Sequence, residues 1–207
     1  MLVKVCCNTD VEEIKASQIA DLIGVVTMSS HKKAVSLKRV RELMKHSEKP
    51  VVLVSDSMKL QDWIEIILLE PPAIQIHGDI PLPDFKKIQS IYGGLVIKSI
   101  TVPTISSDPL RDAEKILHKI KLYEADYYLL DSGKASGKLH DIRISRIVAS
   151  RHPVMLAGGL TPENVVEVIR FVRPIGVDAS SGLEINGRKS QEKIKRFVEA
   201  VKSSSSY

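Results

Sequence analysis

Short apolar runs alternate with amphipathic stretches along the whole chain. Eight runs are rich in Val, Ile and Leu and almost continuously apolar, which is typical of strands buried in a parallel sheet. These predicted strands cover residues 2–6, 22–28, 50–55, 73–77, 95–100, 126–131, 153–159 and 175–181. After each of them, apolar residues recur every three or four positions, which indicates amphipathic helices. The predicted helices cover residues 10–20, 36–47, 58–69, 82–91, 108–122, 140–150, 161–172 and 189–202.

Eight strands, each followed by one helix, predict an α/β fold of the single-domain (β/α)8 or TIM-barrel type. A doubly wound open sheet is the alternative, but it needs no particular number of strands. With 207 residues the chain lies near the lower limit for such a barrel, so we expect short loops. We expect the barrel to cover residues 1–202 and the serine-rich residues 203–207 to form a disordered tail.

Composition narrows the class of function. No apolar run has the length of a membrane span or the form of a signal peptide, and the chain has only two cysteines. We therefore expect a cytoplasmic protein without a membrane partner. The net charge of +5 permits an anionic ligand, although Lys and Arg are mixed with Glu and Asp as on solvated helices. With three Phe and one Trp, a stacking platform for nucleic acid is not expected.

Two small-residue loops predict a phosphate site. Active sites of (β/α)8 barrels lie at the C-terminal ends of the strands, and phosphate commonly binds after the seventh and eighth strands. Here Gly158 and Gly159 follow the seventh strand, in a segment that leads to Thr161 as a helix cap. Ser180 and Ser181 follow the eighth. Backbone N–H groups at a helix start attract anions, so we expect a small phosphorylated ligand.

The two cysteines, Cys6 and Cys7, are neighbours on the first predicted strand. Neighbours in an extended segment point to opposite faces, which disfavours a disulfide between them. No further Cys or His lies at zinc-site spacing, so no metal is expected. Alternation places Cys6 and Lys4 toward the barrel interior and Cys7 toward the helices. Burial as small hydrophobes and a reactive thiol both remain open at this point.

Other polar residues also close the predicted strands. Asp131 ends the sixth strand on its inward face, nearly opposite Cys6. A thiol and a carboxyl group that face each other across a barrel mouth can serve as a base and an acid. His77 follows the fourth strand and Asp178 lies on the eighth. For His77, a substrate contact and support of another site residue are equally compatible with the sequence.

Five segments together resemble one enzyme family. They are "KVC" followed by Asn8-Thr9-Asp10, "IQIHG" (74–78), "LLDSGKASGKLHD" (129–141), "LAGGLTPENV" (156–165) and "VDASSGLE" (177–184). In this order, and over essentially the whole chain, the sequence resembles the phosphoribosylanthranilate isomerases of tryptophan biosynthesis. The last two segments alone would indicate only a phosphate-binding barrel; the inward cysteine and the strand-6 aspartate make the resemblance more specific.

The resemblance implies an Amadori rearrangement of N-(5'-phosphoribosyl)anthranilate to the 1-deoxyribulose 5-phosphate ketone, without a cofactor. It implies Asp131 as the general acid and Cys6 as the general base. The substrate-binding residues that it implies are Lys33, His77, Gly158, Gly159, Asp178, Ser180 and Ser181. Within this set, Gly159 and the two serines correspond to the phosphate site. A monomer or a homodimer is expected.

The sequence departs from the family pattern at three places. The family has Gly after the catalytic cysteine, where this chain has Cys7; a positive φ there would strain a cysteine. The family has an Arg that holds the anthranilate carboxylate, and the matching residue here is Lys33, which keeps the charge but loses the bidentate fork. The loop after Asp131 is shorter than the corresponding loop in many members of the family.

Two further functions remain as alternatives. Another sugar-phosphate isomerase or epimerase of this fold would require a pair of aspartates or a metal-binding set at the strand ends, and neither is evident. A non-catalytic barrel that binds a phosphorylated ligand could keep the pocket without the chemistry. An assay with phosphoribosylanthranilate separates all three.

Overall fold

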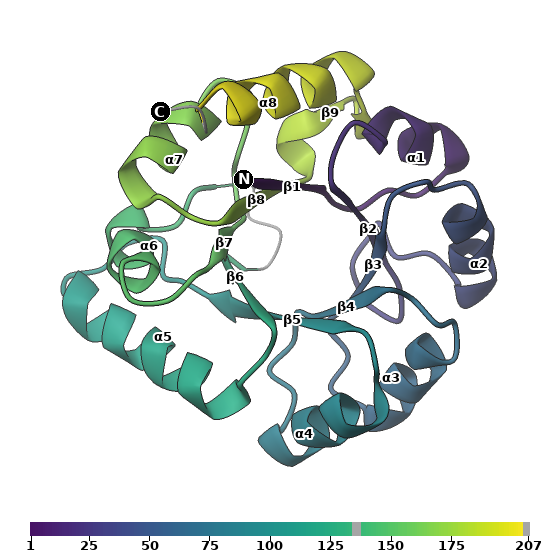
Figure 1. Cartoon of the computed structure of the whole chain (residues 1–207), viewed down its shortest axis with the longest axis horizontal. Coiled ribbons are helices and arrows are strands. Elements are labelled where there is room, and N and C mark those ends of the chain that lie inside the picture. Colours follow the sequence, from purple (N-terminus) through teal and green to yellow (C-terminus); the bar gives the residue numbers. More distant parts are fainter. Residues whose placement is uncertain (134–137, 205–207) are drawn as a thin grey trace.

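The protein forms a closed barrel of eight parallel strands (Figure 1), as the sequence predicts. The structure is a computed structural model, and it describes residues 1–133 and 138–204. The strands are β1 (Leu2–Val5), β2 (Leu22–Val26), β3 (Val51–Ser55), β4 (Ala73–Ile76), β5 (Leu95–Thr101), β6 (Tyr127–Asp131), β7 (Met155–Leu156) and β8 (Gly176–Ala179). Each strand pairs with the next in the chain, and β8 pairs with β1 to close the barrel.

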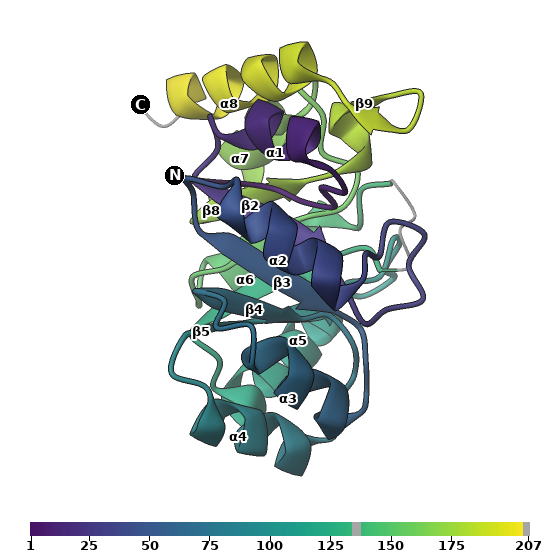
Figure 2. The same cartoon turned by 90° about the vertical axis from the view of Figure 1, so that its right-hand side faces the viewer.

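Helices surround the barrel, one after each strand (Figures 1 and 2). They are α1 (Val11–Ser17), α2 (Leu37–Lys45), α3 (Leu60–Ile67), α4 (Leu82–Ile91), α5 (Pro109–Tyr123), α6 (Ile142–Ala149), α7 (Val165–Val172) and α8 (Gln191–Ser204). Side-chain caps fix several helix starts. Asp10, for example, accepts a hydrogen bond from the Glu13 N–H at the start of α1, and Asp141 accepts one from Arg143 N at α6. Within the described residues, no helix is both long and apolar enough to cross a membrane.

Most elements are shorter than predicted, β7 most of all, since it covers Met155–Leu156 within the predicted residues 153–159. Three further differences concern α7, α8 and the segment between β8 and α8. Helix α7 begins at Val165 rather than at residue 161, because the Asn164 side chain accepts a hydrogen bond from Thr161 N (2.8 Å) and holds residues 161–164 as a turn. Helix α8 continues to Ser204, so residues 203 and 204 are helical and not part of a tail. The rest of the expected tail, and part of the short loop after Asp131, lie outside the described residues.

The third difference is a two-stranded hairpin between β8 and α8. A short 3-10 helix, η1 (Ser181–Leu183), leads into β9 (Glu184–Ile185) and β10 (Arg188–Lys189). Asn186 and Gly187 form its turn with positive φ angles of 51° and 78°. Helix α8 therefore begins at Gln191, two residues later than predicted.

The core has an outer and an inner layer. Val3 and Val5 of β1 pack outward in the layer between the strands and the helices, as alternation along the strand requires. The inner layer fills the barrel and includes Cys6, Val52 and Leu129. Lys4 is also completely buried on the inner face. The barrel interior therefore contains charged side chains, Lys4 and its neighbour Asp178, as well as apolar ones.

Candidate active site

A buried ion pair forms the floor of the barrel mouth. Lys4 Nζ lies 2.8 Å from Asp178 Oδ2, because β1 and β8 are paired with these two residues in register. Burial lowers the pKa of Lys4, but the negative charge of Asp178 and the thiol of Cys6 outweigh it and raise the pKa overall. Lys4 therefore stays cationic. The second oxygen of Asp178, Oδ1, is buried without a hydrogen-bond partner, so it can accept one from a ligand.

The Cys6 side chain lies in the inner layer of the barrel and is buried, as its predicted position on the inward face of β1 requires. There it interacts electrostatically with Lys4. Hydrogen bonding to Cys7 and burial raise the pKa of Cys6 well above the usual thiol value, while Lys4 acts in the opposite direction. The thiol also packs onto β2 at Gly24, where a Cβ atom would lie 2.6 Å from the Cys6 sulfur.

Asp131 ends β6 and contacts His77. The distance from Asp131 Oδ2 to His77 Nε2 is 3.4 Å. The other ring nitrogen of His77 lies 3.1 Å from Ser99 Oγ, which also accepts a hydrogen bond from Gln75. Burial lowers the pKa of His77, so its ring is neutral at neutral pH. His77 thus lies beside the Asp131 carboxyl group; a contact with substrate stays a prediction.

Cys7 does not face the helices, and that prediction is wrong. Its φ angle is +63°, in the left-handed region that costs a non-glycine residue about 1–3 kcal/mol. This conformation breaks the alternation of β1 and turns the thiol into the inner layer, with Cys6. Interaction with the neighbouring Cys6 side chain lowers the pKa of Cys7 to about 6 against the effect of burial, with help from the Ser180 hydroxyl and the charges of Lys189 and His31.

The two predicted phosphate loops lie against each other. Gly158 and Gly159 have positive φ angles of 86° and 65°, which glycine adopts without strain. A Cβ atom at Gly182, in the second loop, would lie 2.1 Å from the carbonyl oxygen of Leu160. Gly158 also borders Asp131, since a Cβ atom there would lie 2.8 Å from Asp131 Oδ1. The glycines therefore bring the phosphate loops and the carboxyl group together.

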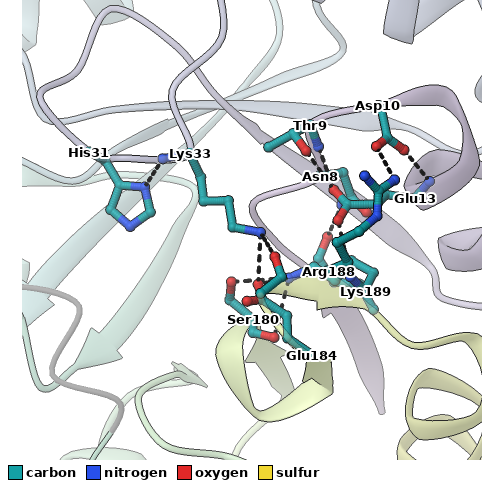
Figure 3. Close-up of polar contacts among 12 residues, drawn as sticks. Asn8, Thr9, Asp10, Glu13, His31, Lys33, Ser180, Glu184, Arg188 and Lys189 are labelled. Carbon is teal, nitrogen blue, oxygen red and sulfur yellow. Dashed lines mark hydrogen bonds and ion pairs between the residues drawn. The ribbon is translucent and has the colours of Figure 1, made fainter.

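Lys33 reaches across the mouth to the β9–β10 hairpin (Figure 3). Its Nζ atom donates a hydrogen bond to Gly187 O and lies 3.4 Å from Glu184 Oε1. Glu184 also pairs with Lys189, whose side chain is fully buried and donates to Ser180 O and Ser180 Oγ, both at 3.2 Å. The hairpin therefore connects the carboxylate candidate Lys33 with the phosphate candidate Ser180. Ser181 lies next to it, exposed.

The model of the N-(5'-phosphoribosyl)anthranilate isomerase family matches residues 3–200. The chain belongs to the phosphoribosylanthranilate isomerase family. The isomerase of Pyrococcus abyssi is 45% identical over 204 residues, which cover 98% of each chain. The structure of the isomerase from Pyrococcus furiosus has 38% identity and a TM-score of 0.91, and the match covers 98% of this chain and 99% of that one.

One solved structure of a phosphoribosylanthranilate isomerase contains a phosphorylated ligand. It is 29% identical to this chain with a TM-score of 0.79, covers 98% of this chain and 100% of its own, and holds reduced 1-(o-carboxyphenylamino)-1-deoxyribulose 5-phosphate. These comparisons confirm the predicted family, fold and class of enzyme, an isomerase.

Two residues near this site are not predicted by the sequence pattern. The helical period places Lys189 on the last helix, but it lies on β10 and donates to Ser180. The Asn186–Gly187 pair is the signal that could have revealed the hairpin. Gly24 was also missed, although an isolated glycine in a strand often marks a close approach of another group.

Replacing Gly24 with alanine should displace the Cys6 thiol. The new Cβ atom would lie 2.6 Å from the Cys6 sulfur, a distance that real contacts do not show. A displacement of about 1 Å can reduce catalysis by up to about 10²-fold, so we expect kcat to fall about 10- to 100-fold. Gly93→Ala is the matched control, since nothing lies within 4 Å of its Cβ position. Equal kcat values for both variants would show that the thiol position is not critical.

Proposed function

We propose that this protein converts N-(5'-phosphoribosyl)anthranilate to 1-(2-carboxyphenylamino)-1-deoxyribulose 5-phosphate, a step of tryptophan biosynthesis. The main support is the arrangement of the barrel mouth, where a thiol beside Lys4, the Asp131 carboxyl group and the paired glycine and serine loops converge. The relative that holds the reduced product analogue supports the same substrate class.

Asp131 acts first, as the general acid. It protonates the furanose ring oxygen, so that the ring opens to a Schiff base between C1' and the anthranilate nitrogen. His77 orients the carboxyl group from one side through its contact at 3.4 Å. Because burial lowers the pKa of His77, the ring is neutral and does not add a positive charge that would favour the carboxylate.

Cys6 acts second, as the general base. Its thiolate removes the C2' proton, and the electron pair moves toward the protonated Schiff-base nitrogen to give an enolamine, which becomes the ketone. The positive charge of the buried Lys4 favours the negative charge of the Cys6 thiolate. Asp178 keeps Lys4 in position and offers its free Oδ1 to a ribose hydroxyl.

The substrate is held at its two charged ends. The phosphate lies at the N–H groups of Gly158 and Gly159 and the hydroxyls of Ser180 and Ser181, where the two loops meet. The anthranilate carboxylate pairs with Lys33, which releases Gly187 O and Glu184 to do so. This assignment places the reacting carbons between Cys6 and Asp131.

A substitution of Lys33 tests the carboxylate contact. We expect Lys33→Ala to raise KM by about 10- to 150-fold with little change in kcat, the equivalent of about 1.5–3 kcal/mol for a hydrogen bond to a charged group. Lys33→Arg should retain or lower KM, because the guanidinium group binds a carboxylate at two points. Lys32→Ala, the same change at an exposed neighbour, is the control. Equal KM values for both alanine variants would show that a residue other than Lys33 binds the anthranilate carboxylate.

Steady-state kinetics with phosphoribosylanthranilate test the proposed function. We expect saturable conversion to the ketone, with inorganic phosphate as a competitive inhibitor. Other phosphosugar aldoses and epimerase substrates serve as comparisons. Turnover of one of those without turnover of phosphoribosylanthranilate would contradict the proposal, and binding without turnover would indicate a non-catalytic barrel.

A further inference from the structure

Lys189 is a buried lysine beside the second phosphate loop. It lies on β10, where its side chain is fully buried, while the side chain of its neighbour Arg188 is exposed. Burial of an ammonium group costs free energy unless its hydrogens find acceptors. The acceptors of Lys189 therefore indicate what the buried charge does.

The ammonium group of Lys189 shares three hydrogen bonds between two residues. It donates to Glu184 Oε1 at 2.8 Å and to Ser180 O and Ser180 Oγ, both at 3.2 Å (Figure 3). A lysine ammonium group has three donors and no acceptor. Ser180 Oγ therefore accepts the hydrogen bond, and the hydroxyl hydrogen of Ser180 points away from the lysine.

Contacts from other elements hold Lys189 in place. Lys189 N donates to Glu13 Oε1 of α1 at 3.0 Å, and Glu13 is only 3% exposed. The other oxygen of Glu13 accepts hydrogen bonds from Thr9 N at 2.8 Å and from Thr9 Oγ1 at 2.9 Å. Ser190 N donates to Leu183 O at 2.9 Å, which connects the end of β10 to η1. Lys189 is therefore ordered before a ligand binds, which lowers the entropic cost of binding.

Ser180 is oriented by this lysine. It lies between β8 and η1, and its side chain makes no capping hydrogen bond to η1. A serine hydroxyl group rotates to suit its neighbours. Lys189 binds both the carbonyl oxygen and the hydroxyl oxygen, so it fixes the main chain and the side chain of Ser180 together. A charged donor on the hydroxyl oxygen also polarises the O–H bond, which makes the hydroxyl a stronger donor.

The oriented hydroxyl group lies in a loop that contacts the other phosphate loop. Gly182, two residues after Ser180, approaches Leu160 O, which follows the glycine pair of the first loop. In the free protein the Cys7 side chain also interacts with the Ser180 hydroxyl. A phosphate oxygen would replace that interaction with a charge-assisted hydrogen bond.

We propose that Lys189 is a positioning residue of the phosphate site, which directs the Ser180 hydroxyl hydrogen toward the phosphate of the substrate. The proposal rests on the phosphate site of the proposed function. Lys189 does not need to touch the phosphate, because Ser180 lies between them. It therefore acts on the binding of the phosphate group and leaves the reacting carbons and the carboxylate end to other residues.

Binding of two matched compounds tests this role without turnover. They are reduced 1-(o-carboxyphenylamino)-1-deoxyribulose 5-phosphate and the same compound without its phosphate group, and calorimetry measures both affinities. We expect Lys189→Met to weaken binding of the phosphorylated compound about 10- to 100-fold, the loss of one hydrogen bond to a charged group. Binding of the compound without phosphate should change little, because Lys33 still holds its carboxylate.

Lys193→Met is the matched control. Lys193 Nζ donates to the backbone oxygen of Glu184 at 3.0 Å, so it contacts the same hairpin from α8. We expect wild-type affinity for both compounds. Addition of Lys189→Met to Ser180→Ala should cause no further loss, because the lysine acts through the hydroxyl group that Ser180→Ala removes.

A second comparison does not require the Lys189 variant to fold. Ser180→Ala and Ser181→Ala each remove one hydroxyl group from the same loop, and Ser181 is exposed. We expect Ser180→Ala to weaken binding of the phosphorylated compound more than Ser181→Ala does. Equal losses would overturn the proposal, because the hydroxyl group that receives the lysine hydrogen bond would have no special role.

The remaining outcomes separate this proposal from the proposed function. Equal loss of affinity for both compounds in Lys189→Met would show that the lysine only supports the hairpin, and would overturn the proposal. Additive losses in the double variant would also overturn it, since the lysine would then act without the serine. A wild-type protein that binds the phosphorylated compound selectively but does not turn over phosphoribosylanthranilate would contradict the proposed function instead.

Discussion

Replacing Cys6 with serine is expected to reduce kcat by at least about 10²-fold, the usual share of a positioned base. Serine keeps nearly the same size, but its hydroxyl group does not ionise near neutral pH and so cannot remove the C2' proton. KM should change only a few-fold, because the phosphate loops and Lys33 do not depend on the thiol. Steady-state kinetics give both constants in one experiment.

The Cys6→Ser result is informative only if the barrel mouth stays intact. Binding of a reduced product analogue to the variant, measured by calorimetry, provides that control. Normal turnover by Cys6→Ser together with loss of turnover in Cys7→Ser would contradict the assignment, and the second thiol would then be the one that contacts the substrate.

Replacing Asp131 with asparagine should be equally damaging, with a loss of at least about 10²-fold in kcat. The amide can keep the contact with His77, so the side chain should remain in place, but it cannot deliver the proton that opens the ring. A substrate analogue with an already open ring should bind to the variant normally. Steady-state and single-turnover kinetics measure the loss.

Glu199→Gln is the matched control, since it makes the same carboxyl-to-amide change at an exposed position on α8. We expect it to have wild-type kinetics. If the Asp131→Asn protein retains more than a tenth of the wild-type kcat, Asp131 is not the general acid. His77 or the free oxygen of Asp178 would then be the next residues to test.

The sequence was sufficient for the fold and for most positions around the barrel mouth. Eight apolar runs with helical stretches after them predict the barrel, because strand number and period are properties of the sequence itself. Alternation along β1 correctly placed Lys4 inside, since residues 2–5 are regular strand. It failed one step later at Cys7, because alternation assumes an extended backbone and the φ angle there is +63°.

Contacts between distant segments could not be predicted in the same way. The pairing of Lys33 with Glu184, and of Lys189 with Ser180, depends on the hairpin that follows β8. A helical period was assigned to the start of α8, and this concealed the hairpin turn at Asn186–Gly187. The free Oδ1 of Asp178 also depends on the packing of the whole interior.

Conversion of C2'-deuterated phosphoribosylanthranilate tests the central claim most directly. We predict that the wild-type protein forms the ketone, that the label leaves C2', and that the reaction is slower than with unlabelled substrate when proton removal limits the rate. Cys6→Ser should form no ketone at a comparable rate while it still binds the product analogue. Absence of ketone with the wild-type protein at saturating substrate, or equal rates for the wild-type and Cys6→Ser proteins, would contradict the account.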